Sequence, residues 1–334
     1  MINPPYRAAD DRYECGMQYA RCGRSGILMP RISLGLWHNF GDVNPLAVSR
    51  GMLHYAFDHG ITCFDLANNY GPSYGSAEET FGRVMEGSFR PYRDELFIAT
   101  KAGYDMWPGP YGNWGSRKYL FASLDQSLRR MNLDYVDLFY SHRYDPETPL
   151  EETLQALVDI VRRGKALYVG ISRWPHEAAE VAYRYLRERD VPCLVYQGRY
   201  SMLDRDVERT GVLAQAADEG AGFVAFSPLA QGLLTSRYLG GDIPAGSRAS
   251  QGRFLKSKDI TPELVTRLNA LNDIAARRGQ TLAQMALAWV LKDPRVTSVI
   301  VGSSSAAQLA DTLQSLDNLA FTDEECRECD ALTV

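Results

Sequence analysis

Eight short apolar segments recur along this chain of 334 residues. They are rich in β-branched and aromatic residues, and glycine or polar residues bound each of them. Segments of this kind are typical of strands that are buried on both faces of a parallel sheet. The predicted strands are Ile32–Leu36, Ile61–Asp65, Leu96–Thr100, Val136–Tyr140, Ala166–Ile171, Cys193–Tyr196, Gly222–Phe226 and Thr297–Val301.

Longer segments between these strands carry apolar residues at three- and four-residue spacing, which predicts amphipathic helices. The pairs Thr148-Pro149 and Thr261-Pro262 favour a threonine N-cap followed by proline, and the string from Ser76 to Glu79 is typical of a capping box. Glycines at 60, 164 and 220 are expected just past three helix ends, where a left-handed residue is favoured. The predicted helices are Leu46–Asp58, Ser76–Met85, Arg117–Met131, Leu150–Arg163, Pro175–Glu188 and Leu203–Glu219.

Eight strand–helix units without a second core predict a closed (β/α)8 TIM barrel, an α/β fold, as a single domain over 1–334 with its core at about 17–316. The rival fold, an open doubly wound sheet, normally carries Gly-x-Gly-x-x-Gly after its first strand, and the chain has no such string. Met17–Arg21 and Gly26–Met29 predict an N-terminal β-hairpin. The long segment Ser227–Asp259, after the seventh strand, predicts a cofactor-binding loop or lid, because long irregular loops in compact domains usually have a function.

Charge, hydropathy and cysteine spacing argue against several classes of function. The net charge of −5 makes nucleic acid an improbable partner, because phosphate binding needs a basic face. No apolar segment approaches the ~20 residues of a membrane helix, and Met1–Cys15 is polar, so a cytoplasmic protein without membrane contact is expected. Cys326-Arg-Glu-Cys329 lacks a second ligand pair, so we interpret it as two incidental cysteines and predict no metal site.

Polar side chains stand where three consecutive predicted strands end. Asp65 ends the second strand, Lys101 follows the third, His142 follows the fourth, and Tyr70 lies on the loop after Asp65. In α/β barrels the chemistry takes place at the carboxyl ends of the strands. We therefore expect these four side chains to meet over the barrel mouth as catalytic residues.

The four residue types suit proton donation to a carbonyl oxygen. A buried Lys101 ammonium would lower the pKa of Tyr70 from ~10 toward neutrality, and Asp65 would compensate the buried charge. His142 would orient the carbonyl, and Tyr70 would protonate its oxygen as general acid. None of the four is a nucleophile with a matched base, so a cofactor must supply a hydride. Each residue alone has a structural reading, as an ion pair, a core histidine or a turn tyrosine; their conjunction favours catalysis.

At these residues the chain resembles the aldo-keto reductase superfamily. The tetrad motifs of that superfamily are matched by Asp65-x-Ala-x-x-Tyr70-Gly71, Thr100-Lys101 and Ser141-His142, and the similarity runs from about Met17 to Leu316. The chain is similar in particular to the branch of bacterial L-glyceraldehyde 3-phosphate reductases and potassium-channel β subunits, on the strings at 35–41, 101–112 and 228–234.

The resemblance implies a barrel that binds NADPH in extended form, without a Rossmann domain, and reduces a carbonyl beside Tyr70. It assigns the nicotinamide end to Ser172, Arg173, Gln197 and Phe226. It assigns the phosphates to Ser227, Pro228, Leu229, Ala230, Gly232, Arg237, Ser247 and Arg248, and the adenosine end to Gly302, Ser304 and Gln308.

The residues themselves support part of this assignment. Val301–Ser305 ends the last strand and opens a helix, whose positive N-terminal end attracts phosphate. The alternatives are an ordinary helix cap for Ser304 and solvated loop charges for Arg237 and Arg248. Two departures from the family pattern are present: Asp311-Thr312 replaces a common Glu-Asn pair near the adenine, and Arg173 stands where many relatives have Asn or Ser.

Trp37, Tyr70, Trp107 and Arg143 are expected to line the substrate pocket at the same end of the barrel. Arg143 would bind a substrate phosphate or hydroxyl. In the alternative reading, the tryptophans pack the loops and Arg143 pairs with Asp145. The resemblance implies a small carbonyl substrate, such as a phosphorylated or polyhydroxylated aldehyde or methylglyoxal, and a homo-oligomer.

Two other functions compete with reduction. A redox-sensing, NADPH-binding β-like subunit of a membrane channel would keep the same tetrad but turn over little substrate. A barrel hydrolase or isomerase would need no nicotinamide cofactor; a glycosidase would need two carboxylates across a cleft, and only Asp65 stands at an obvious strand end.

Overall fold

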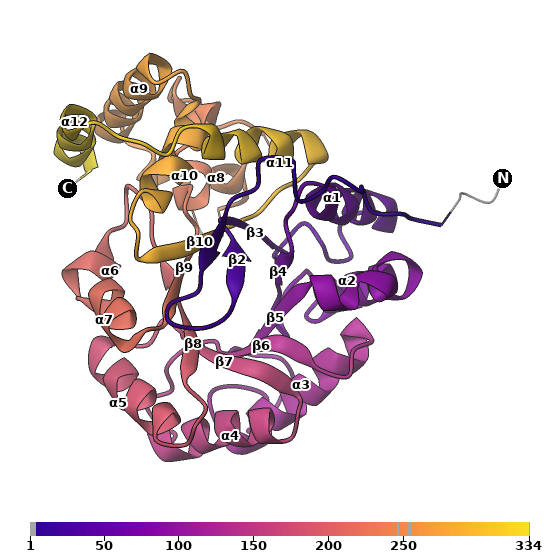
Figure 1. Cartoon of the computed structure of the whole chain (residues 1–334). Helices are drawn as coiled ribbons and strands as arrows, with labels where there is room; N and C mark the ends of the chain where they lie inside the picture. The colour runs from indigo at the N-terminus through magenta and orange to yellow at the C-terminus, as the bar shows by residue number, and fades with distance from the viewer. Residues whose placement is uncertain (1–4, 246, 253–254, 334) are drawn as a thin grey trace.

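The computed structural model describes residues 5–245, 247–252 and 255–333, and within them eight parallel strands close into a barrel. Figure 1 shows the barrel with the helices arranged around it. The strands lie in the barrel in the order in which they occur in the sequence, and β10 closes the ring by pairing with β3 and β9. The strands are β3 (Ile32–Gly35), β4 (Cys63–Asp65), β5 (Phe97–Ala102), β6 (Val136–Ser141), β7 (Ala166–Ser172), β8 (Cys193–Arg199), β9 (Gly222–Phe226) and β10 (Val296–Val301). The predicted (β/α)8 TIM barrel is confirmed.

Helices cover the outside of the barrel, and five of the six predicted helices are found within one residue of their predicted bounds. A π-helical turn (Met85–Phe89) and a 3-10 turn (Arg90–Glu95) follow α2. The α-helices are α1 (Leu46–Asp58), α2 (Ser76–Val84), α3 (Arg117–Met131), α4 (Leu150–Arg162), α5 (His176–Arg187), α6 (Asp206–Arg209), α7 (Val212–Glu219), α8 (Arg248–Gln251), α9 (Pro262–Arg277), α10 (Leu282–Leu291), α11 (Ala306–Leu313) and α12 (Asp323–Thr333).

Three local predictions about helices were wrong. The segment 203–219 is not one helix, because Gly211 adopts a left-handed φ of 76° and separates α6 from α7. The N-cap of α2 is Gly75, and the Ser76 hydroxyl donates to the Ser73 carbonyl, so no capping box forms. Thr148 donates to Asp145 and does not cap α4, whose N-cap is Pro149. Thr261 does cap α9, with Pro262 as its first residue.

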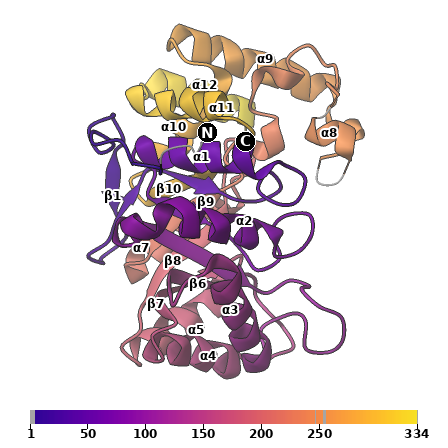
Figure 2. The ribbon, with the colours of Figure 1, turned by 90° about the vertical axis from the view of Figure 1, so that its right-hand side faces the viewer.

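The predicted hairpin is also confirmed, and it covers the amino end of the barrel. Its strands β1 (Tyr19–Arg21) and β2 (Leu28–Pro30) pair antiparallel, and the Arg24 amide donates to the carbonyl of Gly220, just before β9 begins. Cys22 and Met29 of the hairpin pack in the barrel interior with residues such as Leu138 and Val195. In Figure 2, β1 and α8 lie on opposite sides of the barrel.

The larger core lies between the strands and the surrounding helices, where apolar side chains such as Phe64, Phe81 and Trp289 are buried. No helix in the described part of the chain has the length and apolar character needed to cross a membrane. Cys326 and Cys329 are both free thiols on α12. Among the described residues, no group of three His, Cys, Asp or Glu side chains is placed to hold a metal ion.

Candidate active site

Asp65 and Lys101 form a buried ion pair at the carboxyl ends of the adjacent strands β4 and β5. The Lys101 Nζ lies 2.5 Å from Asp65 Oδ2 and 2.7 Å from the carbonyl oxygen of Leu66. Gln197, on β8, donates to the other carboxylate oxygen of Asp65 at 3.0 Å. Burial lowers the pKa of Lys101, and Asp65 opposes that shift. The pair therefore compensates a charge that would otherwise be costly inside the barrel.

Tyr70 lies beside this pair, with its ring centroid 4.9 Å from the Lys101 Nζ. We expected the ammonium to lower the pKa of Tyr70, and that expectation is wrong. The pKa of Tyr70 is raised well above its ordinary value, first by burial and then by the charge of Asp65 and by Tyr104. The Lys101 charge is already matched by Asp65, so burial dominates. Tyr70 is therefore a protonated phenol at neutral pH, the form that can donate a proton.

His142 follows β6 and completes the group. Its ring meets the ring of Tyr70 edge-on at 5.8 Å and that of Tyr104 at 4.7 Å. Burial, and then the charges of Lys101, Arg173 and Arg143, place the pKa of His142 well below its usual value. The imidazole is therefore neutral at physiological pH. Its Nδ1 is buried and has no hydrogen-bond partner among the described residues, which is uncommon for a buried polar atom outside a functional site.

Several residues assigned to a cofactor by resemblance end the strands that continue the ring. Ser172 ends β7, Gln197 lies on β8 and Phe226 ends β9. Backbone strain accompanies them, because Arg173, Ser227 and Ala230 have φ values of 57°, 54° and 46°. Left-handed conformations are unfavourable for residues with a side chain and cluster at functional sites. The segment that holds Pro228, Leu229 and Gly232 therefore begins with a constrained turn.

Two arginines of the long segment after β9 lie close enough to repel each other. Burial and then the charge of Arg237 lower the pKa of Arg248. The Arg248 Nη1 donates to Gln231 Oε1 at 2.5 Å, and its guanidinium carbon lies 5.2 Å from the centroid of the Trp37 ring. No carboxylate in the described part of the chain pairs with either arginine. Two adjacent cations without a counter-charge fit a phosphate, as a nicotinamide dinucleotide phosphate would supply.

Gln231 was missed in the sequence, because nothing in its neighbourhood indicates that it would meet an arginine at position 248. Ser247 is the N-cap of the short helix α8, and its Oγ accepts from the Ser250 amide at 3.3 Å. This contact keeps Arg248 at the start of that helix.

The residues assigned to the adenosine end follow β10. A Cβ at Gly302 would meet nothing within 4 Å, so open space adjoins the strand end. Ser304 donates to Gln308 Oε1 from its amide and its hydroxyl, both at 3.0 Å. The alternative that Ser304 caps the helix is wrong, because Ser305 is the N-cap of α11.

Comparison with known proteins agrees with this arrangement. The model of the aldo/keto reductase family matches residues 31–334. The chain belongs to the aldo/keto reductase family. It is 55% identical over 319 residues to L-glyceraldehyde 3-phosphate reductase of Escherichia coli K12, which covers 94% of this chain and 92% of that protein. It is also 34% identical over 305 residues to a probable voltage-gated potassium channel subunit beta of Arabidopsis thaliana. That alignment covers 90% of this chain and 92% of the plant protein. The chain is therefore an oxidoreductase of this family.

The residues expected to line the substrate pocket differ from one another in what they contact. The Trp37 ring lies 6.2 Å from the ring of Tyr70, next to the tetrad. Trp107 packs against Tyr119, with 5.1 Å between ring centroids, and this contact joins a loop to α3. The alternative of an Arg143–Asp145 pair is wrong, because Asp145 accepts instead from the Gly115 amide and Thr148.

Arg143 instead joins two loops beside His142. Its Nε donates to the Gly103 carbonyl at 2.7 Å, and its Nη2 donates to Asn113 Oδ1 at 2.8 Å. Asn113 was not identified from the sequence. Its place in a loop of Gly, Pro and aromatic residues carries no signal for this contact.

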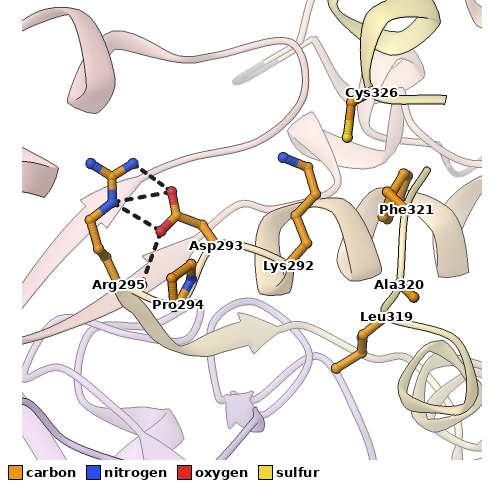
Figure 3. Close-up of a pocket in the computed structure, with 8 residues that line it drawn as sticks. All are labelled: Lys292, Asp293, Pro294, Arg295, Leu319, Ala320, Phe321 and Cys326. Atoms are coloured by element: carbon orange, nitrogen blue, oxygen red, sulfur yellow. Dashed lines mark hydrogen bonds and ion pairs between the residues drawn. The ribbon is translucent and has the colours of Figure 1, made fainter. Parts of the chain in front are cut away.

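A surface hollow of about 510 Å³ lies away from these residues, beside the start of β10, and Figure 3 shows its lining. Arg295 pairs with Asp293 there at 2.6 Å, and the Lys292 Nζ lies 4.7 Å from the Trp289 ring centroid. This hollow adjoins the amino end of the barrel, whereas chemistry in α/β barrels takes place at the carboxyl end. It is therefore separate from the candidate active site.

Proposed function

We propose that this chain reduces small aldehydes or ketones to alcohols with NADPH, and that Tyr70 is the general acid. The observation that carries the proposal is the meeting of a protonated Tyr70, a neutral His142 and the Asp65–Lys101 pair at the carboxyl ends of three consecutive strands. These groups can hold a carbonyl oxygen and deliver one proton to it. Oxidoreductases that reduce a carbonyl need such a set of side chains.

The steps follow from the states of the side chains. His142, which is neutral, donates a hydrogen bond to the carbonyl oxygen and orients it. NADPH, when bound, would supply the hydride for the carbonyl carbon. As negative charge grows on the oxygen, Tyr70 transfers its proton there, and the phenolate takes a proton from solvent after the alcohol leaves. Asp65 and Gln197 keep Lys101 in place between turnovers.

The cofactor would lie across the same end of the barrel. Four residues on or just after β7, β8 and β9 would contact the nicotinamide beside Tyr70: Ser172, Arg173, Gln197 and Phe226. Arg237 and Arg248 would hold the 2′-phosphate, because no described carboxylate neutralises them. The turn at 227–232 and residues 302–308 would hold the pyrophosphate and adenosine between these ends.

The substrate proposal is a small polar aldehyde, of the glyceraldehyde 3-phosphate or methylglyoxal type, bound by Trp37, Tyr70, Trp107 and Arg143. The name of the Escherichia coli relative supports it. A cytoplasmic location and a homo-oligomer remain predictions.

The similarity to a plant channel subunit favours a second candidate, an NADPH-binding redox-sensing subunit with little turnover. Tight NADPH binding without aldehyde-dependent NADPH oxidation would favour that candidate.

Replacement of one hydroxyl tests the proposed chemistry. Tyr70→Phe should lower kcat for aldehyde reduction by about a hundredfold or more, because the proton donor is lost. NADPH affinity, measured by fluorescence titration, should stay the same. Tyr74→Phe is the matched control, because Tyr74 is on the same loop and exposed. Full activity in Tyr70→Phe would remove Tyr70 as the acid, and absence of NADPH binding in the wild type would overturn the cofactor proposal.

A further inference from the structure

Two aromatic rings and two hydrogen bonds hold the guanidinium of Arg143. Its carbon lies 3.6 Å from the centroid of the Trp114 ring and 4.3 Å from that of Tyr104. Its Nε and Nη2 are bonded to Gly103 and Asn113. Its Nη1 makes no hydrogen bond to the described residues. The two rings and two hydrogen bonds fix the direction in which this remaining donor points.

Trp114 adopts an unusual backbone conformation to reach this position. Its φ is 71°, a left-handed value that is unfavourable for a residue with a bulky side chain. Asn113 Oδ1 accepts both the Trp114 amide, at 2.7 Å, and Arg143. The other end of the Asn113 side chain donates to Asp105 at 2.5 Å, which orients the amide. Trp114 as a whole is 39% exposed.

Arg143 lies close to a second cation, Arg173, because both contact Tyr104. No carboxylate in the described ranges forms an ion pair with Arg143 or Arg173. Arg173 donates to the Tyr104 hydroxyl at 2.9 Å, so both arginines contact the tyrosine whose ring packs on His142. The Asp105 carboxylate accepts from Asn113 and forms no ion pair with either arginine among the described residues. Two cations that share one aromatic neighbour beside the proposed carbonyl site favour a substrate with a negative charge.

We propose that Trp114 is a positioning residue that gives this enzyme its preference for aldehydes with an anionic substituent, by holding Arg143 against Tyr104 with Nη1 directed at that substituent. The inference rests on the proposed reductase function. Within the described part of the chain, Trp114 has no ring contact or hydrogen bond with Tyr70 or His142, so it acts through Arg143 and not on the reacting carbonyl. A purely structural role, in which Trp114 only joins two loops, would affect all aldehydes alike.

The test compares glyceraldehyde 3-phosphate with glyceraldehyde, which differ only in the phosphate. In Trp114→Gly, KM for glyceraldehyde 3-phosphate should rise by about tenfold, the scale of one charge-assisted hydrogen bond. Its kcat, and both constants for glyceraldehyde, should stay within about twofold. Glycine accepts the left-handed φ, so the backbone stays unstrained. Trp114→Phe should restore most of the preference, and Tyr111→Ala, at an exposed aromatic residue of the same loop, is the matched control.

Each result decides between the explanations. Equal losses for both aldehydes, or no change in the phosphate preference, would overturn the role of Trp114 while leaving the reductase proposal standing. A wild-type protein that reduces neither aldehyde would overturn the proposed function itself. If Trp114→Gly does not fold, Trp114→Leu, which keeps an apolar side chain without an aromatic face, must show the same selective rise in KM.

Discussion

His142 is packed against Tyr70 and Tyr104, and the charges of Lys101, Arg173 and Arg143 add to the effect of its burial. The burial of His142 and these three charges oppose its protonation. Tyr70 responds to burial in the opposite sense, because its neutral form is the protonated one. Burial therefore leaves both side chains uncharged, and both can donate a hydrogen bond to a carbonyl oxygen. The same condition makes the site sensitive to acid.

The depressed pKa of His142 predicts a loss of stability in acid. The unfolded chain binds a proton at this side chain near its ordinary pKa of 6.5, and the folded chain does not. Stability is therefore unaffected above that pH and falls as the pH drops below it. Between about pH 7.5 and about pH 5.5, His142→Gln should lose about 1 kcal/mol less unfolding free energy than the wild type.

Urea denaturation at the two pH values measures this difference. His176→Gln, outside the site, is the matched control. A variant at position 142 that loses as much stability as the wild type would show that His142 does not cause the acid sensitivity.

The long segment after β9 adds two arginines to the carboxyl end of the barrel. It begins with a strained turn at Ser227 and Ala230, and it carries Arg237 and Arg248 toward the mouth. Arg248 meets Trp37 and Gln231, which belong to different parts of the chain. Such contacts connect the segment to the loop after β3. The segment can therefore contribute cations at the carboxyl end of the barrel although it contains little regular structure.

Removal of one of these cations should change the cofactor preference. Arg248→Ala should weaken NADPH binding by about tenfold or more, the cost of charge-assisted hydrogen bonds to a phosphate. NADH, which lacks the 2′-phosphate, should be weakened less. Dissociation constants from fluorescence titration check the difference, with Lys258→Ala as a control on the exposed part of the same segment. An unchanged NADPH-to-NADH ratio would place the 2′-phosphate elsewhere.

At the scale of the whole molecule, the hairpin β1–β2 covers one end of the barrel and the candidate site occupies the other. Met29 is 1% exposed and packs in the barrel interior with Cys63, Leu138 and Ile300. The neighbouring Leu28 points outward and is 56% exposed. The hairpin is therefore part of the interior packing and not an appendage.

This pair of neighbours allows a matched test of that role. Met29→Ala should lower the free energy of unfolding by about 2–5 kcal/mol, because it leaves a cavity inside the barrel. Leu28→Ala should change it by less than about 0.5 kcal/mol, because the side chain is solvated. Chemical denaturation measures both. Similar values for the two variants would mean that the hairpin does not contribute to the barrel core.

The barrel and the strand-end positions of Asp65, Lys101 and His142 can be predicted from the amino-acid sequence alone. Strands buried on both faces must be continuously apolar, so the eight segments are visible without any structure, and Asp65, Lys101 and His142 stand at their ends in the chain. Gly211 shows where local reading was too coarse: a glycine inside a helical pattern was a sign of the break between α6 and α7.

The pKa values of the buried side chains and the partners of the long side chains depend on tertiary contacts. The pKa of Tyr70 rises because burial outweighs a cation that Asp65 already matches, and burial is a property of the folded molecule. Arg143 bonds Asn113 instead of Asp145, and Arg248 bonds Gln231. An arginine reaches many possible neighbours, and which one it meets depends on how separate loops come together, which no local pattern encodes.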